Sequence, residues 1–202
     1  MNTQSIFTRQ ADPTYEDGTH FAHYVHLASE GQFRLLLGRR VTEILADAFI
    51  QPNHDLSFEH TIFAEVNGEV VGMASGYTAP QHTASSDEPL RQAAGRSAFR
   101  IACMFALATP VLRFLHSYDA GDFYVEFLAV DEAHRGHGIG SKLLQAMEDR
   151  ARASGCTHVA IDVAARNRRA YRLYERCEFA AIRRWPRTRL VRPNILRMTK
   201  PL

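Results

Sequence analysis

An apolar run, three alternating glycines and an amphipathic run follow one another in this chain, and no other feature constrains its fold as much. Phe123 to Val130 predicts a strand, and Ser141 to Ser154 predicts a helix that Gly155 ends. Between them, Arg135-Gly136-His137-Gly138-Ile139-Gly140 lets the backbone curl closely around a ligand, because glycine carries no side chain. The first amides of a helix lack acceptors within it, so the loop predicts a site for phosphate oxygens. Arg135 would add a positive charge.

The spacing of this loop argues against two common nucleotide-binding motifs. A dinucleotide-binding fingerprint needs G-x-G-x-x-G directly after the strand, whereas here Asp131 to Arg135 intervene and Ser141 replaces the third glycine. A phosphate loop of the nucleoside-triphosphatase kind ends in Gly-Lys-Ser/Thr, whereas Ser141-Lys142 has the reverse order. The alternative is a glycine-rich turn without a ligand, which is disfavoured because each glycine weakens the start of a helix.

Two motifs at this separation resemble one known family. Leu128-Ala129-Val130 followed by Arg135-x-x-Gly138-x-Gly140 resembles the acetyl-CoA signature of the GNAT superfamily of N-acetyltransferases, Q/R-x-x-G-x-G/A. Asn167 to Tyr174 resembles the second motif of that family, N-x-x-A-x-x-L-Y. The close match covers Phe123 to Phe179, whereas the first half of the chain matches only in the order of its elements.

The resemblance implies an α/β (α+β) fold in one domain, residues 1–202, with a helical insert at about 80–120. Its sheet would be mixed, twisted and mostly antiparallel, flanked by helices. The central parallel strands, Phe123–Val130 and His158–Val163, would splay apart and hold the pantetheine arm of acetyl-CoA between them. Residues that the resemblance assigns to binding acetyl-CoA are Leu128, Ala129, Val130, Arg135, Gly136, His137, Gly138, Ile139, Gly140, Ser141, Asn167 and Tyr174.

Members of this family usually transfer the acetyl group directly to an amine, which needs a base for the amine proton and an acid for the leaving thiolate. Tyr174 matches the usual acid of the family, although its ring could simply pack. Glu126 is the base candidate, because an acid in the apolar strand is costly to bury unless it is used or paired. Tyr124 shares its face unless a bulge intervenes. A salt bridge of Glu126 to an arginine, and a base acting through water, stay open as alternatives.

The chain departs from the family pattern at two places. Glu178 stands where the second motif normally has glycine, and a left-handed cap there would cost about 1 kcal/mol. The helix could therefore end differently, which would change the direction of Tyr174. The insert between Tyr77 and Phe123 replaces what is a short loop in many members. It could line the substrate site, act as a lid, or form the contact of a homodimer.

The first half of the chain predicts a strand, two helices and a hairpin. A strand fits Ile6 to Gln10, and a helix would begin with Asp12 as N-cap and Pro13 as first residue and run to about Ala28. A second helix fits Phe33 to Phe49. Thr61 to Val66 and Glu69 to Tyr77, joined by Asn67-Gly68, predict an antiparallel hairpin with a type I′ turn.

Predictions for the remaining segments are simpler. In the insert we expect a polar loop, a helix, a break at Pro110, another helix and a turn. The second motif predicts a helix, and two strands follow it. These segments are Pro80 to Asp87, Glu88 to Leu107, Val111 to Tyr118, Asp119 to Asp122, Asn167 to Cys177, Phe179 to Trp185 and Ile195 to Thr199.

Composition sets limits on partners and compartment. A formal net charge of +2 over 202 residues predicts neither nucleic acid nor membrane as a partner. An odd number of cysteines, Cys103, Cys156 and Cys177, at no metal-like spacing favours reduced thiols, hence a cytoplasmic protein, and the N-terminus shows no secretion signal. His20, His23 and His26 roughly share a helix face, but surface histidines are far commoner than metal ligands, so no metal is expected.

The sequence therefore predicts an acyltransferase that is an acetyl-CoA-dependent N-acetyltransferase. Its acceptor would be a primary amine of a small molecule or peptide. The alternatives are a non-catalytic acyl-CoA-binding sensor, which would need neither Glu126 nor Tyr174, and an enzyme acting on protein N-termini or lysines.

Overall fold

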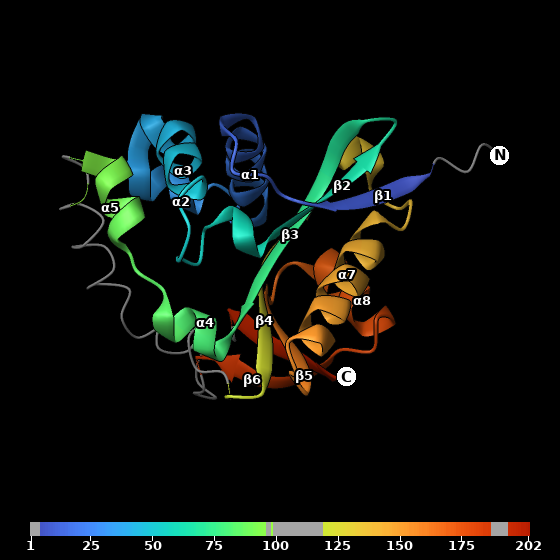
Figure 1. The fold of residues 1–202 in the computed structure, drawn as a ribbon. Helices are drawn as coiled ribbons and strands as arrows, with labels where there is room; N and C mark the ends of the chain where they lie inside the picture. The colour runs from blue at the N-terminus through green and yellow to red at the C-terminus, as the bar shows by residue number, and fades with distance from the viewer. Residues whose placement is uncertain (1–4, 96–97, 99–118, 187–193) are drawn as a thin grey trace.

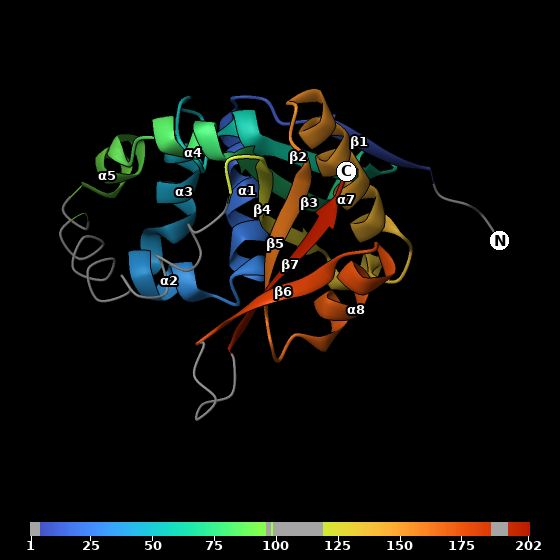
Figure 2. The ribbon, with the colours of Figure 1, turned by 90° about the horizontal axis from the view of Figure 1, so that it is seen from below.

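The computed structural model describes residues 5–95, 98, 119–186 and 194–202. Seven strands in these ranges form one sheet in the order β1-β2-β3-β4-β5-β7-β6. Along this order they are β1 (Ile6–Gln10), β2 (Thr61–Val66), β3 (Glu69–Thr78), β4 (Asp122–Val130), β5 (His158–Ala164), β7 (Ile195–Pro201) and β6 (Ala180–Trp185). Only the β4–β5 pair among them is parallel, which confirms the predicted mixed sheet. Figure 2 shows β5, β7 and β6 continuing the sheet from β4.

Helices cover both faces of the sheet (Figure 1). One face carries α1 (Tyr15–Ala28), α2 (Gln32–Leu37), α3 (Val41–Phe49) and α5 (Glu88–Ala94), and the opposite face carries α7 (Ile139–Ala153) and α8 (Arg168–Arg176). Shorter helices are α4 (Ala79–Ala84), η1 (Gly38–Arg40), η2 (Phe58–His60) and η4 (Glu132–His134). No helix of the described residues is long and apolar enough to span a bilayer.

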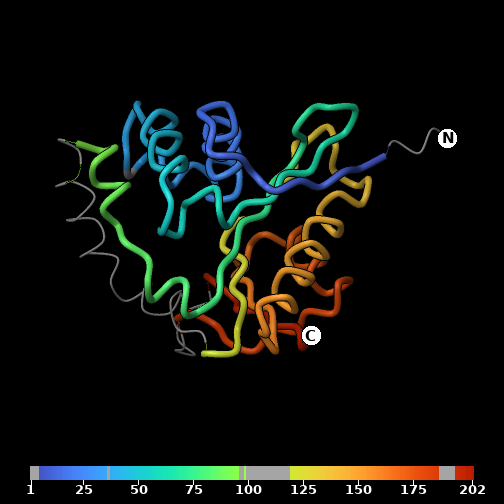
Figure 3. Tube along the Cα trace, viewed as in Figure 1, coloured from blue at the N-terminus to red at the C-terminus, as the bar shows by residue number. Residues whose placement is uncertain are grey.

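Local sequence signals place several elements as predicted. Asn67 (φ 55°) and Gly68 (φ 82°) both have positive φ, which is the conformation of a type I′ hairpin turn between β2 and β3. Figure 3 shows this hairpin beside β1. Gly155 has a φ of 74° just after α7, as its C-terminal position requires. The turn before β4 closes with the amide of Asp122 donating to the carbonyl of Asp119 over 2.9 Å.

The predicted start of the first helix is wrong. α1 begins at Tyr15, with Thr14 as N-cap, whose hydroxyl accepts from the amide of Asp17. The carboxylate of Asp17 accepts from the amide of Asp12 over 2.8 Å and from the guanidinium of Arg9, which holds the preceding segment to the sheet. Asp12 is therefore a partner of the first turn and not its cap.

The single helix predicted over residues 33–49 is divided in the structure. Gly38, with a φ of +80° and a ψ of −153°, ends α2, and the 3₁₀ turn η1 leads into α3. Glycine reaches this conformation at little cost, so it breaks the helix where the hydrophobic pattern continues.

Part of the insert also differs from its prediction. Residues 79–84 form α4 instead of a polar loop, because Thr78 and Gln81 build a capping box and Pro80 occupies the first turn. α5 ends at Ala94, before Gly95. The rest of the helix predicted to Leu107, and the one predicted over Val111 to Tyr118, lie outside the described residues.

The central parallel strands pair over a short stretch only. Asp122 to Val125 of β4 lie opposite His158 to Ile161 of β5, and the ladder then stops. Beyond it, residues 127–130 of β4 pair only with β3 among the described strands, while β5 continues along β7. This confirms the predicted splay: a V opens at Val125 and Ile161, and one backbone edge of β4 faces into it.

Candidate functional site

The glycine loop ends in a left-handed turn that begins α7. Gly136 and Gly138 both have a φ of +86°, which a residue with a side chain rarely adopts. A Cβ at either position would meet no heavy atom within 4 Å in the described structure. Space that a side chain would fill is therefore open to a ligand at this turn.

α7 begins two residues earlier than predicted, at Ile139, with Gly138 as N-cap. The first amide bonded within the helix is that of Lys142, which donates to the carbonyl of Gly138 over 3.0 Å. Gly138 has no side chain with which to cap the amides of Ile139, Gly140 and Ser141. These amides and the helix dipole form an anion-binding end of the kind that phosphates use. The residues present thus fit a pyrophosphate.

Gly140 also has a packing role that the sequence did not indicate. A Cβ there would lie 2.9 Å from Cδ2 of Leu173, which is closer than real contacts. The glycine therefore lets α8 approach the first turn of α7. Nearby, the thiol of Cys177 on α8 donates to the hydroxyl of Ser141 over 3.7 Å.

The cationic side chains of the loop turn toward the backbone around them. Arg135 donates from Nε to the carbonyl of Val130 over 2.9 Å, so its guanidinium lies at the end of β4. Nδ1 of the exposed His137 lies 3.2 Å from the carbonyl oxygen of His134. Asn167 caps α8, since its side-chain oxygen accepts from the amide of Ala170 over 3.1 Å.

A β-bulge at Glu126 reverses the side-chain alternation of β4. Ser75 of β3 pairs with Phe127 and Gly76 pairs with Val125, which leaves Glu126 as the extra residue. Before the bulge, Phe123 and Val125 pack toward α7; after it, Leu128 and Val130 do so, while Phe127 and Ala129 pack toward α1. Glu126 immediately follows the last residue that pairs with β5, so the bulge lies at the apex of the V.

The carboxyl group of Glu126 is withdrawn from solvent. Its Oε2 atom is buried and has no hydrogen-bond partner in the described part of the chain. The side chain as a whole is half-buried. Burial, and secondly the negative charge of Asp55, raise the pKa of Glu126 well above its ordinary value. A carboxylate with a raised pKa is a stronger base than an exposed one, so the side chain is suited to accept a proton.

Tyr124 is already a hydrogen-bond donor. Its hydroxyl donates to Oδ2 of Asp162 over 3.0 Å, and Asp162 pairs with the buried guanidinium of Arg197 at 2.6 Å. Burial, followed by the charge of Asp162, raises the pKa of Tyr124 well above its ordinary value. The phenol therefore stays protonated and ties β4 to β5 at the apex of the V.

Tyr174 is buried at the end of α8, where its ring packs on Phe179 with 6.1 Å between centroids. Burial raises the pKa of its phenol, which stays protonated at neutral pH. The amide of Phe179 donates to the carbonyl of Tyr174 (2.9 Å), and the amide of Glu178 donates to that of Glu175 (3.0 Å). These two bonds form a Schellman motif. Glu178 takes the left-handed position with a φ of 70°, so the helix keeps the ending that glycine normally provides.

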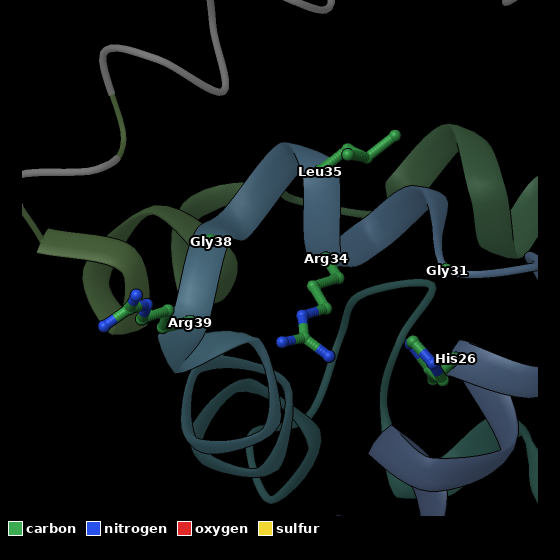
Figure 4. A pocket seen from close by; sticks show the side chains of 6 residues that line it. All are labelled: His26, Gly31, Arg34, Leu35, Gly38 and Arg39. Atoms are coloured by element: carbon green, nitrogen blue, oxygen red, sulfur yellow. The ribbon is translucent and has the colours of Figure 1, made fainter.

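The turn between α1 and α2 lies against the loop before α8. Glu30 forms an ion pair with Arg166, the residue that precedes the cap of α8. Beside this turn is an open hollow of about 370 Å³ lined by His26, Gly31, Arg34, Leu35, Gly38 and Arg39. In Figure 4 the side chains of Arg34 and His26 point into the same space, whereas Leu35 points away. The hollow is cationic.

The three histidines of α1 have separate surroundings. His20 has an edge contact with Phe63, Nε2 of His23 lies 3.1 Å from Oδ1 of Asp131, and His26 lines the hollow. The described residues contain no group of three or more His, Cys, Asp or Glu side chains that could hold a metal ion.

Sequence reasoning did not find Asp55, although it lies near Glu126 in space. Asp55 is in the loop before β2, far from β4 in the chain, and no local motif marks it. The long-range fold alone brings the two acids together.

Comparison with known proteins agrees with this geometry. The family model described as "Acetyltransferase (GNAT) family" matches residues 32–179. N-alpha-acetyltransferase 30 of Saccharomyces cerevisiae is 30% identical over 79 residues, 39% of this chain and 45% of the relative. Acetyltransferase Atu2258 of Agrobacterium fabrum is 47% identical over 62 residues, 31% of this chain and 44% of the relative. The chain thus spans less than half the length of these curated relatives.

Among the solved structures that match nearly the whole chain is one of an acetyltransferase. It is described as "The crystal structure of acetyltransferase", with a TM-score of 0.68 and 25% identity, and the match covers 96% of this chain and 98% of that one.

Proposed function

Because this chain belongs to the GNAT family of acetyltransferases, we propose that it transfers an acetyl group from acetyl-CoA directly to a primary amine of a small molecule or a peptide. One observation carries the proposal. The open edge of β4 runs from Val130, to whose carbonyl Arg135 of the glycine loop donates, to the bulged, half-buried Glu126. From Val130 to Glu126 this edge is about 13 Å long, at roughly 3.3 Å per residue.

Acetyl-CoA would be bound by the glycine loop and by the open backbone edge of β4. The free amides after Gly138 would bind the pyrophosphate, and the pantetheine arm would pair with the open backbone near Ala129 and Val130. Arg135 lies where its charge favours the phosphates, and Asn167 would contact the arm from the start of α8. The thioester would then lie close to Glu126.

The chain's side chains would divide the proton transfers between them. Glu126 would take a proton from the ammonium form of the acceptor, and the neutral amine would attack the carbonyl carbon of the thioester. The carbon–sulfur bond would then break. Tyr174 would donate a hydrogen bond to the leaving thiolate, which suits a phenol that keeps its proton. Tyr124 would position Asp162 and hold the apex of the V.

The acceptor side would include the insert. We propose a single catalytic domain over residues 1–202 in which α4, at the start of the insert of about 80–120, borders the acceptor, because His82 of α4 stacks on Tyr77 beside Tyr124. The name of the yeast relative, an N-alpha-acetyltransferase, makes the α-amine of a peptide one candidate acceptor.

A thiol-release assay with acetyl-CoA and a panel of amines, polyamines, amino acids and peptides tests the proposal. We expect the wild type to release thiol with at least one amine. Glu126→Gln and Tyr174→Phe should lower turnover, for Glu126 by roughly 100-fold or more, without loss of acetyl-CoA binding. The matched controls are Glu69→Gln, at an exposed position, and Tyr171→Phe, at a half-buried position of α8; both should leave turnover unchanged. Binding of acetyl-CoA without thiol release on any amine would refute catalysis.

A further inference from the structure

Buried polar atoms without hydrogen-bond partners gather on the α1 side of the sheet. The described residues contain six such atoms, and four of them, Asp55 Oδ1, His60 Nδ1, Ser75 Oγ and Glu126 Oε2, concern this side; the other two are His134 Nδ1 and Arg150 Nη1. Buried polar atoms of native proteins nearly always have a partner, which is a protein group, an ordered water or a ligand. The proposed mechanism uses only Glu126, so the other three need a separate explanation.

These atoms belong to one layer. Ser75 is 1% exposed and pairs with Phe127, which packs toward α1, so its hydroxyl faces the same side, next to the bulge at Glu126. His60 is 7% exposed and has an edge contact with the ring of Tyr77, 5.9 Å between centroids. Tyr77 in turn lies 5.8 Å from the ring of Tyr124, two residues before Glu126.

Only one of the two carboxylate oxygens of Asp55 has a hydrogen-bond partner in the described part of the chain. Nδ1 of His82, on α4, lies 2.6 Å from Oδ2 of Asp55, and the backbone amide of Asp55 donates to the hydroxyl of Ser85 over 3.0 Å. The ring of His82 stacks on Tyr77 at 5.4 Å with an interplanar angle of 14°. Since Oδ2 is engaged, Oδ1 remains buried and without a partner. The contacts therefore run from Asp55 through His82 and Tyr77 to the ring of Tyr124, two residues before Glu126. The charge of Asp55 acts on the carboxyl group of Glu126.

We propose that Asp55 is a second acceptor-binding residue, and that its free Oδ1 together with Oε2 of Glu126 binds the ammonium group of a cationic amine substrate. The inference rests on the proposed function and adds to it a second residue that recognises the ammonium form of the acceptor. Two buried carboxylates repel each other, and a cation between them removes the repulsion. The unpartnered hydroxyl of Ser75 offers a further acceptor to the N–H groups.

The proton balance follows from this arrangement. The ammonium group binds, one proton moves from its nitrogen to Glu126, and the nitrogen lone pair forms the new bond to the acetyl carbon while the carbon–sulfur bond breaks. A second proton leaves the nitrogen, and the departing thiolate takes up one proton by way of Tyr174, so that coenzyme A leaves as the thiol. Glu126 then releases the proton to solvent. Asp55 exchanges no proton in these steps, and its Oδ2 keeps the contact with Nδ1 of His82 at 2.6 Å.

Binding of the cation should depend on pH. Burial and Asp55 raise the pKa of Glu126, so below that pKa the free protein carries the group protonated, and binding an ammonium displaces its proton. Affinity should therefore rise with pH through that range. Tyr124 also interacts with Glu126. The titratable groups that interact with Asp55 are His54, His60 and His82, and Glu59 and Arg150 act in turn on His60.

Calorimetric titration with n-butylamine tests the inference without requiring turnover. This probe stays protonated between pH 6 and pH 8, because alkylamines titrate near 10. We expect Asp55→Asn to weaken binding on the order of tenfold. Its pH dependence should move to lower pH but remain, because burial still raises the pKa of Glu126. The matched control is Asp47→Asn, an exposed acid on α3, which should bind like the wild type. Equal binding by Asp55→Asn and the wild type would overturn the inference.

A second measurement uses the wild type alone, in case Asp55→Asn fails to fold. Heats of n-butylamine binding at pH 6 in two buffers of different ionisation enthalpy give the number of protons released. Release of a fraction of a proton supports the shared site, and zero release overturns it. Failure of the proposed function is a distinct result, since it shows as acetyl-CoA binding without thiol release on any amine.

Discussion

Replacing Glu178 with glycine should stabilise the protein. Glu178 has a φ of 70° and occupies the left-handed position of the Schellman motif that ends α8. A residue with a Cβ pays roughly 1–2 kcal/mol for this conformation. Glycine avoids that cost but adds about 0.4–1 kcal/mol of conformational entropy to the unfolded chain.

The ion pair that the substitution removes is weak. Nζ of Lys200 lies 3.6 Å from Oε2 of Glu178, whose side chain is 83% exposed. The pair therefore adds only roughly 0.3 kcal/mol to the free energy of unfolding. A net stabilisation of about 0.5 kcal/mol remains for Glu178→Gly. Glu178→Ala loses the same ion pair but keeps the left-handed strain, so it should be slightly less stable than the wild type.

Urea denaturation followed by circular dichroism measures both variants. With a urea dependence of about 2 kcal/mol per molar, Glu178→Gly should raise the midpoint by about 0.25 M. Acetyl transfer should be unchanged, because the hydrogen bonds that orient Tyr174 come from backbone amides. If Glu178→Gly proves no more stable than Glu178→Ala, the reasoning about the strained cap is wrong.

Three further outcomes follow from the structure. Gly138→Ala puts a Cβ at a φ of +86°, so it should lower the free energy of unfolding by about 0.5–1 kcal/mol and weaken acetyl-CoA binding; equal binding to the wild type would contradict the anion-binding turn. Asp162→Asn removes the charge that pairs with buried Arg197, so the urea midpoint should fall by an amount equivalent to about 3 kcal/mol, and an unchanged midpoint would contradict this. Burial lowers the pKa of His54, so the native state keeps it neutral while the unfolded chain protonates near 6.5, and stability is lost as pH falls below that value. The raised pKa of Glu126 has the opposite effect, because its protonation stabilises the native state as pH falls. Comparison of the wild type with His54→Gln isolates the contribution of His54, and the variant should lose less stability between pH 7.5 and pH 5.5.

Local chemistry made much of the fold predictable from the sequence. Asn67-Gly68 requires a tight hairpin turn, and the Asn167 to Tyr174 segment carries its own cap, so β2, β3 and α8 lie where they were expected. The splay of β4 from β5 was expected only through family resemblance, and the structure confirms it. The hydrophobic periodicity of residues 33–49 continues across Gly38, so the sequence predicts one helix there. In the structure Gly38 ends α2 and divides that helix.

The site was predictable only where it is local. The loop from Arg135 to Gly140 is continuous in the chain, so its chemistry is visible as a motif. The bulge at Glu126 depends on the register between β3 and β4, which no run of residues in β4 reveals. The approach of Asp55 to Glu126 depends on the path of the loop before β2 and on His82 of α4. Contacts of this kind follow from tertiary packing and need a structure.

Thermal unfolding with and without acetyl-CoA tests the central claim most directly. Acetyl-CoA at one hundred times its dissociation constant should stabilise the native state by about 2.7 kcal/mol. For a chain of this size that corresponds to a rise in Tm of roughly 5–10 °C. Gly138→Ala should show a smaller rise at the same concentration. A wild-type Tm that stays unchanged at millimolar acetyl-CoA would contradict the claim that the glycine loop and the open edge of β4 bind this molecule.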